Sequence, residues 1–168
     1  MTSTDASHLD VDTAAATSAE APMPGELIYE YTPRVVETVE YGASSEGLFA
    51  GHPSPPEGGR LDLYLEGPVI DGKLKGNVKG VDYLNFRADG RAELHIHAEI
   101  TTEGGKKVAL EAGGVAIGRQ GSSVFELREH ASLTTHHPEL AWVNTVELWA
   151  RGQVDASTGQ VHLRAYAV

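Results

Sequence analysis

From Arg60 to the C-terminus, apolar and polar residues alternate in short runs, and this alternation constrains the fold more than any other feature of the chain. In RAELHIHAEITT, one parity is polar and the other is Leu94, Ile96, Ala98 and Ile100. Successive side chains of a β-strand point to opposite faces, so such a run gives a strand with one apolar face. No segment is convincing as a long amphipathic helix, although residues 122–134 fit a helix as well as a strand. The alternation therefore predicts an all-β protein.

Turn signals separate these runs at short intervals. The dipeptides Asp71-Gly72 and Asp89-Gly90 are typical of two-residue β-hairpins, and further turns are expected at Gly104-Gly105, near Gly121 and over Ser157–Gly159. About eight strands joined in this way indicate an antiparallel meander. A sheet of that size has exposed edges unless it closes on itself. We therefore expect a single antiparallel up-and-down β-barrel, with room inside for its own side chains or one small ligand.

The N-terminal part of the chain differs from the rest in composition. Residues 1–25 are rich in Ala, Ser, Thr and acidic residues without periodicity, so we expect a disordered tail there and a barrel domain over residues 26–168. That domain begins with a long strand that we expect to bend at Pro33, because proline cannot donate to a strand ladder. The first residues lack the basic and apolar regions of a secretory signal, and we therefore expect a cytoplasmic protein.

The composition excludes several function classes. A net charge of −11 argues against nucleic acid and anionic membranes as partners, because both bind to positive surfaces. No apolar run approaches the roughly 20 residues of a membrane span. The chain has no cysteine, which rules out disulfides, thiolate metal sites and a cysteine nucleophile. Its eight histidines are numerous for the length, and histidine titrates near neutral pH.

Several short motifs follow one another in a set order: Gly67-Pro68, Gly80 with Asp82, Asp89-Gly90, His95 with His97, Trp142-Val143-Asn144 and Gly152. In this order and spacing, from about Arg60 to Val168, the chain resembles domain-of-unknown-function family 3237, which comprises small bacterial and fungal proteins. The resemblance implies a closed, lipocalin-like barrel and very little about activity. Two positions depart from the family pattern. Its aspartate and arginine are His95 and His97 here, and the tyrosine expected two residues before the tryptophan is Leu140.

His95, His97 and Glu99 share one face of their strand, because side chains two residues apart point the same way. Three interpretations are open. The face is ordinary wet surface, or it lines a cavity, or it holds zinc, iron or manganese with these three residues as ligands. The resemblance favours the cavity, since the family carries a polar pair at the histidine positions. Our prediction is that His95 and His97 are catalytic and that no metal or other cofactor takes part.

Asp82 has Leu84 and Phe86 on its own parity. If these two side chains point into the barrel, Asp82 does too, and apolar surroundings then raise the pKa of its carboxyl group and fit it for proton transfer. The alternative is an aspartate that caps a glycine-rich turn. We count Asp82 among the candidate catalytic residues.

Asn144 shares a parity with Trp142 in the strand that we expect over LAWVNTVELWARG. An interior amide needs hydrogen-bond partners, so Asn144 either ties strands together or holds a substrate carbonyl or carboxylate group. Trp142 and Phe86 are candidates for contact with an aromatic substrate. Substrate contacts are also expected from Tyr29, Tyr64 and Glu99.

These residues together predict a cofactor-independent lyase or isomerase. It would transfer a proton, in a decarboxylation, dehydration or cyclisation for example, on a small aromatic or other apolar carbonyl or carboxylate compound bound inside the barrel. In this hypothesis His95 or His97 is the acid or base, Asp82 orients it, and Asn144 holds an oxyanion with a tyrosine. The alternatives are a non-catalytic barrel for a small hydrophobic ligand and a His-ligated metal enzyme. We also expect a homodimer, because outward apolar residues need cover.

Overall fold

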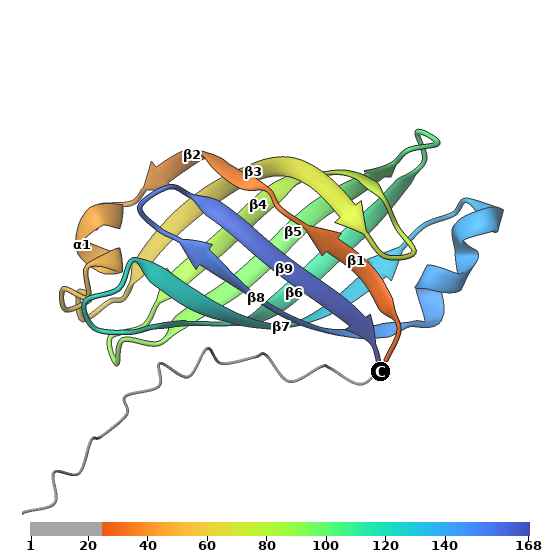
Figure 1. Ribbon diagram of the computed structural model, residues 1–168. Helices are drawn as coiled ribbons and strands as arrows, with labels where there is room; N and C mark the ends of the chain where they lie inside the picture. The colour runs from red at the N-terminus through yellow and green to blue at the C-terminus, as the bar shows by residue number, and fades with distance from the viewer. Residues whose placement is uncertain (1–24) are drawn as a thin grey trace, which may run out of the picture.

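The computed structural model describes residues 25–168, which form one antiparallel sheet of nine strands wrapped into a barrel (Figure 1). The predicted tail, up to residue 24, lies outside the described residues. The chain also contains a short helix, α1 (Ser45–Phe49), and a 3-10 helix, η1 (Pro138–Thr145). The strands are β1 (Leu27–Tyr31), β2 (Arg34–Glu40), β3 (Gly59–Asp71), β4 (Gly76–Phe86), β5 (Ala92–Thr102), β6 (Lys107–Gly118), β7 (Val124–Thr134), β8 (Glu147–Asp155) and β9 (Gln160–Ala167).

The barrel is closed by β1 and β2, which share one position in the sheet. Strands β3 to β9 pair in chain order, and both β1 and β2 pair with β3 on one side and β9 on the other. The interruption between them falls at Thr32 and Pro33, because Pro33 has no N–H to donate to a neighbouring strand. Nine strands thus fill eight positions, and the predicted closed antiparallel barrel is confirmed. The single long strand expected at its start is divided into two at Thr32 and Pro33.

The hairpin turns fall at the predicted glycines. Gly72, Gly90, Gly105, Gly121 and Gly159 all have positive φ, the conformation that primed turns and αL positions require. Gly72 is the most constrained of them, because a Cβ atom there would lie 2.6 Å from the carbonyl oxygen of Ile28. The turn between β3 and β4 therefore packs directly on β1.

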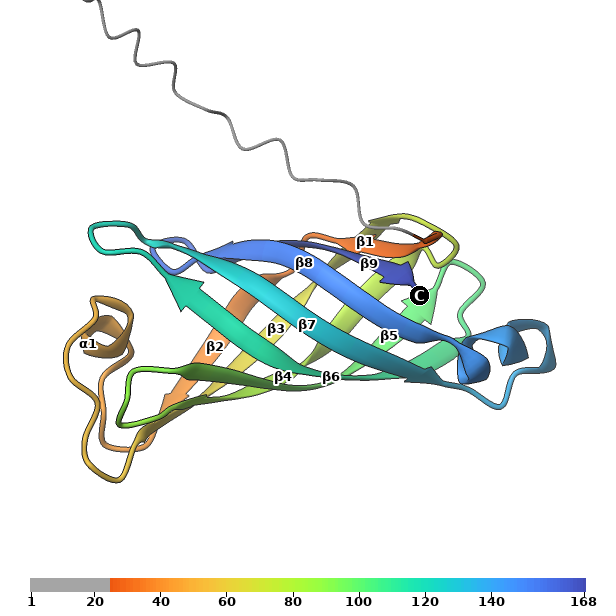
Figure 2. The same ribbon diagram turned by 90° about the horizontal axis from the view of Figure 1, so that it is seen from below.

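The two ends of the barrel differ in how they are filled. Around η1 the interior is solid, with fully buried Leu74, Val78, Ile100, Val108, Leu110, Val143 and Leu148. Around α1 it is hollow, and a cavity of about 1350 Å³ is open at that end. Figures 1 and 2 show α1 and η1 at opposite ends of the barrel. Neither helix of the described part has the length or the apolar character needed to cross a membrane.

Two local predictions are settled by the structure. Residues 124–134 form β7, not a helix, and their alternate side chains are buried. The strand expected over LAWVNTVELWARG is wrong in its first half, because Pro138–Thr145 form η1 and β8 begins only at Glu147. Pro138 suits the first turn of a helix, where its missing N–H costs nothing.

Candidate functional site

Four carboxylates are buried in the described residues, and two of them are paired with cations. Glu30 accepts from Arg164 at 3.0 Å and lies 2.6 Å from a ring nitrogen of His162. Asp62 lies 2.8 Å from the Nε atom of Arg60 and accepts the hydroxyl of Tyr41. The other two, Asp82 and Glu129, form no ion pair with any described residue, and both line the cavity. A buried carboxylate without a cation is costly, so this pair marks the candidate site.

Asp82 lies on the inward face of β4 with Leu84 and Phe86, and it is only 5% exposed. The ladder between β4 and β5 skips Tyr83 and Leu84, and the N–H of His95 donates to Oδ1 of Asp82 at 2.9 Å instead. Burial raises the pKa of Asp82 to about 6, although the His95 N–H and the charge of the His95 ring oppose the shift. The carboxyl group is therefore mostly ionised at neutral pH.

Glu129 is the one charged residue on the inward face of β7. Its neighbours on that face are all buried: Phe125, Leu127, Ala131 and Leu133. Glu129 is 1% exposed, and neither of its carboxyl oxygens has a hydrogen-bond partner among the described residues. Burial first, and then the charge of Asp82, raises the pKa of Glu129 to about 8. The group is therefore mostly protonated at neutral pH.

Two tyrosines from β1 complete the polar part of the interior. The rings of Tyr29 and Tyr31 stack with their centroids 5.3 Å apart, and both residues are buried. Burial and the charge of Glu129 raise the pKa of both phenols, and Asp82 adds to the effect on Tyr31. We call Tyr31, Asp82 and Glu129 the cavity floor. Tyr29 lies beside it, outside the cavity lining, and its hydroxyl has no partner among the described residues.

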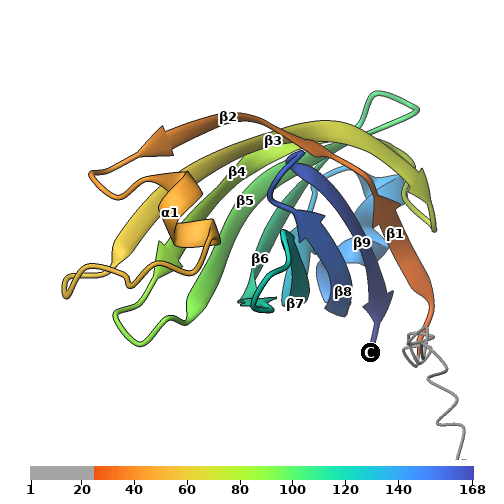
Figure 3. The same ribbon diagram turned by 60° about the vertical axis from the view of Figure 1, so that its left-hand side comes forward.

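Apolar side chains form the walls of the cavity, and an aromatic cluster stands at its mouth. The walls include Leu63, Leu65, Leu84, Leu94, Ile96, Leu127 and Val161. At the mouth, Phe49 of α1 meets the rings of Phe86 and Phe125 edge-on, with centroids 5.7 and 5.4 Å away. Figure 3 shows α1 at this end of the barrel. A ligand that reaches the floor would thus be surrounded mainly by apolar surface.

The histidine face predicted to line the cavity lies on the outside of the barrel. His95 and His97 are exposed, because Leu94 and Ile96 of the same strand fill the interior. The prediction that these rings point inward is wrong. Glu99 shares their outer face and pairs with Lys107. Among residues 25–168, no group of three or more His, Asp or Glu side chains is arranged to hold a metal ion.

The other predicted site residues divide between the two sides of the wall. Phe86 lines the cavity together with Asp82, and Tyr29 faces the interior beside the floor. Tyr64 is 39% exposed on the outer face of β3 and does not line the cavity, so it does not lie where the predicted contact inside the barrel requires.

Asn144 and Trp142 belong to η1, at the closed end of the barrel. Asn144 accepts the N–H of Thr135 and donates to its carbonyl oxygen, both at 2.8 Å. Trp142 lies under the ammonium group of Lys73, 4.2 Å from the ring centroid. Neither residue lines the cavity, so the prediction that they contact a substrate there is wrong. The structural alternative for Asn144 is the one that the geometry supports.

Replacing Asn144 by alanine is expected to lower the free energy of unfolding by about 1–2 kcal/mol, because the two backbone groups of buried Thr135 lose their partner. Urea denaturation of the variant checks this. Asn85→Ala is the matched control, since the amide of Asn85 makes only contacts of 3.4 Å. Unchanged stability of Asn144→Ala would contradict the structural role.

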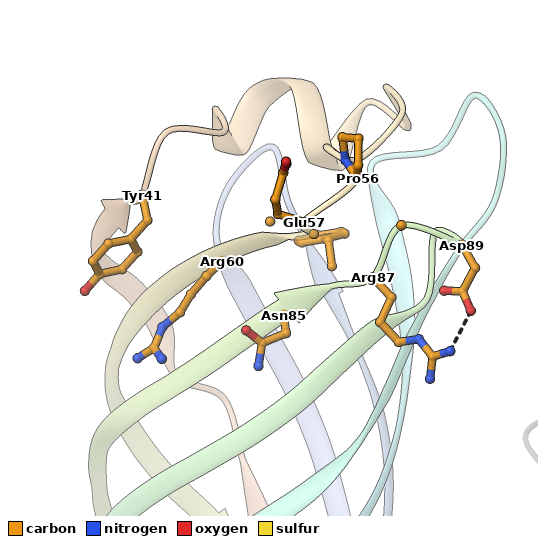
Figure 4. Close-up of a pocket in the computed structure, with 11 residues that line it drawn as sticks. Tyr41, Pro56, Glu57, Arg60, Asn85, Arg87 and Asp89 are labelled. Carbon is orange, nitrogen blue, oxygen red and sulfur yellow. Dashed lines mark ion pairs between the residues drawn. The ribbon is translucent and has the colours of Figure 1, made fainter.

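A second hollow, of about 660 Å³, lies on the outer wall near the mouth (Figure 4). Its guanidinium groups already have anionic partners. Arg60 pairs with Asp62, and Arg87 pairs with Asp89 at 2.9 Å and with Glu93 at 3.5 Å. Within the described residues, this hollow therefore offers a ligand no unpaired guanidinium group.

Sequence reasoning missed Glu129, although the sequence carries a signal for it. In VFELREHASLT, one parity reads Phe125, Leu127, Glu129, Ala131 and Leu133. A single acid on an apolar strand face is the expected sign of an interior functional carboxyl group. The signal depends on the segment being a strand, and the helix alternative for residues 122–134 concealed it.

The fold and the site together define a closed β-barrel that contains an open cavity with an acidic floor. The chain belongs to the family described as "Protein of unknown function (DUF3237)", whose model matches residues 45–168. The family membership inferred from the sequence is thus confirmed. A comparison with curated proteins found no match.

Solved structures share this fold. A protein with unknown function from Clostridium acetobutylicum ATCC 824 superposes with a TM-score of 0.70 at 19% identity, over 87% of this chain and 99% of its own. A β-barrel-like protein from Acinetobacter baumannii AYE gives 0.63 at 19% identity, over 88% and 98%. An enzyme from Penicillium herquei gives 0.56 at 15% identity, over 87% and 97%. At these identities the likeness shows the fold alone.

Proposed function

We propose that the protein is a cofactor-independent lyase or isomerase that transfers a proton on a small apolar or aromatic molecule held in the cavity. The observation that carries the proposal is that two buried carboxyl groups, Asp82 and Glu129, lie at the floor of a largely apolar cavity without an ion pair to any described residue. Two carboxyl groups whose surroundings separate their pKa values are a recurrent arrangement of acid and base in enzymes. Here the pKa values are about 6 and about 8.

The two carboxyl groups take different roles in this proposal. Asp82, ionised at neutral pH, removes a proton from a C–H or O–H group of the substrate. Glu129, protonated at neutral pH, keeps its proton and donates a hydrogen bond from its O–H group to the substrate oxygen on which negative charge develops, and the Tyr31 hydroxyl is a second hydrogen-bond donor at the floor. Return of the proton from Asp82 to another atom of the substrate, or to the product, completes the cycle. Low-polarity walls strengthen both interactions relative to water.

The histidines keep only an indirect part in this scheme. His95 contributes its backbone N–H, which holds Oδ1 of Asp82 in place, while its ring lies outside. The role of base therefore passes from His95 and His97 to Asp82. The structural neighbour from Penicillium herquei is described as an enzyme, which supports catalysis as a property open to this fold.

The base is tested with nitrobenzisoxazole, a neutral aromatic probe. Loss of its ring C–H proton to a base breaks the N–O bond and gives a coloured cyanophenolate, so no cofactor is needed. We expect the protein to open the ring about 10²–10⁴ times faster than acetate at the same carboxylate concentration, which is the usual contribution of a positioned base. The His97→Gln variant is expected to retain the wild-type rate, because this exposed ring is not among the groups that act on Asp82.

Two results would contradict the proposal. A wild-type rate no higher than that of acetate would show that the cavity holds no positioned base. A rate lost in the His97→Gln variant, with its fold intact by circular dichroism, would show that the outer face takes part in the reaction.

A further inference from the structure

We propose that the natural ligand of the cavity presents a hydrogen-bond donor without negative charge, a hydroxyl or a protonated amine, to the floor, and that carboxylates are rejected. The inference rests on the proposed function in that it names the substrate class of the same site. It reverses one part of the sequence-based hypothesis, which included carboxylate substrates.

The floor is acidic and has no cation. Its ionisable groups are Asp82, Glu129 and Tyr31, with Tyr29 adjacent, and none of them carries a positive charge in any protonation state. The ring of His95 acts on Asp82 only from the outer side of the wall, and Asp62 adds negative charge. A carboxylate on the ligand would meet Asp82 in surroundings of low polarity, where like charges repel strongly.

The charged residues at the mouth of the cavity do not compensate the negative charge of the floor. The charged or titratable residues around the mouth are Glu46, His52, Asp89 and Arg119. Arg119 is thus the only residue of the cavity lining, within the described part of the chain, that is positive at all ordinary pH values. It belongs to the loop between β6 and β7 and not to the floor. An anion entering the cavity would therefore leave its one cationic partner behind at the mouth.

Three of the four carboxyl oxygens of the floor have no donor among the described residues, which is the second observation. No described residue donates to Oδ2 of Asp82, and both oxygens of the fully buried Glu129 lack partners. Unpaired polar atoms at such burial are rare in folded proteins and call for a partner that residues 25–168 do not supply. Asp82 in its ionised form is acceptor-only, so its partner must be a donor. An ammonium group on the ligand would donate a hydrogen bond to Asp82 and also neutralise the charge of the carboxylate. A hydroxyl group would donate the hydrogen bond without adding charge.

The test compares four naphthalene derivatives that differ in one substituent: methylnaphthalene, naphthylmethanol, naphthylmethylamine and naphthoate. Isothermal titration calorimetry with the full chain at pH 7.5 measures binding without any turnover. We expect naphthylmethylamine and naphthylmethanol to bind about tenfold or more tightly than methylnaphthalene, and naphthoate to bind about 100-fold more weakly than naphthylmethylamine. The Asp82→Asn variant, which keeps the shape of the side chain, should bring the amine and the carboxylate to within about tenfold of each other.

Two outcomes would overturn the inference. Naphthoate binding as tightly as naphthylmethylamine would show that the floor does not select against anions. Methylnaphthalene binding as tightly as both donors would show that the cavity reads only apolar surface. Because these are binding measurements, they can fail while nitrobenzisoxazole is still turned over, and they can succeed in a barrel that has no catalytic activity. If the Asp82→Asn variant does not fold, the affinities of the wild-type protein for the four naphthalene derivatives are enough to test the inference.

Discussion

The Glu129→Gln variant is expected to be more stable than the wild type by several kcal/mol above pH 8, and to differ little from it at pH 4. The carboxyl group of Glu129 is fully buried, and its pKa rises from the usual value near 4.5 to about 8 on folding. The folded state thus holds this proton more tightly than the unfolded chain does. Its contribution to stability is complete below about pH 4.5 and is lost as the pH rises through 8.

The size of the effect follows from the shift in pKa. Each unit corresponds to about 1.4 kcal/mol, so ionisation of Glu129 is expected to cost the folded protein about 4–5 kcal/mol by pH 9. Glutamine occupies the same space without ionising and is not subject to this loss. Urea denaturation of both proteins at pH 4, 7 and 9 measures the difference.

Glu126→Gln is the matched control for this experiment. Glu126 lies two residues before Arg128 on the outer face of the same strand, and the hydrogen bond from Arg128 lowers the pKa of Glu126. Its replacement removes an exposed ion pair, so no gain of stability at high pH is expected. Equal pH dependence of the wild type and Glu129→Gln would contradict the buried, protonated state of Glu129.

The Asp82→Asn variant is expected to lose about 10²–10⁴-fold of the ring-opening rate on nitrobenzisoxazole, because an amide cannot remove the proton. Its fold should survive, since the Asn side-chain oxygen still accepts the N–H of His95. Phe86→Leu is a control that alters the cavity lining without removing an ionisable group. It should change binding of the probe more than the chemical step.

The pH dependence of the same reaction gives a second readout. The rate should rise as Asp82 ionises near pH 6 and fall as Glu129 loses its proton near pH 8, which gives a bell-shaped profile. The upper limb reports on both groups, because the charge of Asp82 contributes to the raised pKa of Glu129. A rate that rises through pH 6 and does not fall near pH 8 would show that the protonated form of Glu129 is not needed for the reaction. A wild-type rate in the Asp82→Asn variant would show that Asp82 is not the base.

The fold was predictable because it depends on local patterns. Alternation assigns each strand an apolar face, and the glycine turns set the order of the meander. The inward position of Asp82 followed from the same argument, since Leu84 and Phe86 share its parity. That argument applied equally to His95 and His97, whose own parity opposes Leu94 and Ile96. The resemblance to a family with a polar pair there gave those rings an importance that the strand geometry does not support.

The rest of the site depends on contacts that alternation does not encode. Asn144 looked interior because the segment was taken as a strand, whereas Pro138 and the packing of Val143 produce a 3-10 helix that covers the end of the barrel. Glu129 was not identified from the sequence because residues 122–134 fit the periodicity of a helix as well as that of a strand. The hollow itself depends on which side chains fill the barrel at each level, and only the three-dimensional register shows that.

The central claim is that Glu129 keeps its proton at neutral pH inside the cavity while Asp82 has lost its own. Carbon-13 NMR of the side-chain carboxyl groups, titrated from pH 4 to 10 and assigned with the Glu129→Gln and Asp82→Asn variants, tests it most directly. The prediction is a glutamate carboxyl resonance with its midpoint near 8 and an aspartate resonance with its midpoint near 6. Midpoints near 4 for both groups would contradict the account.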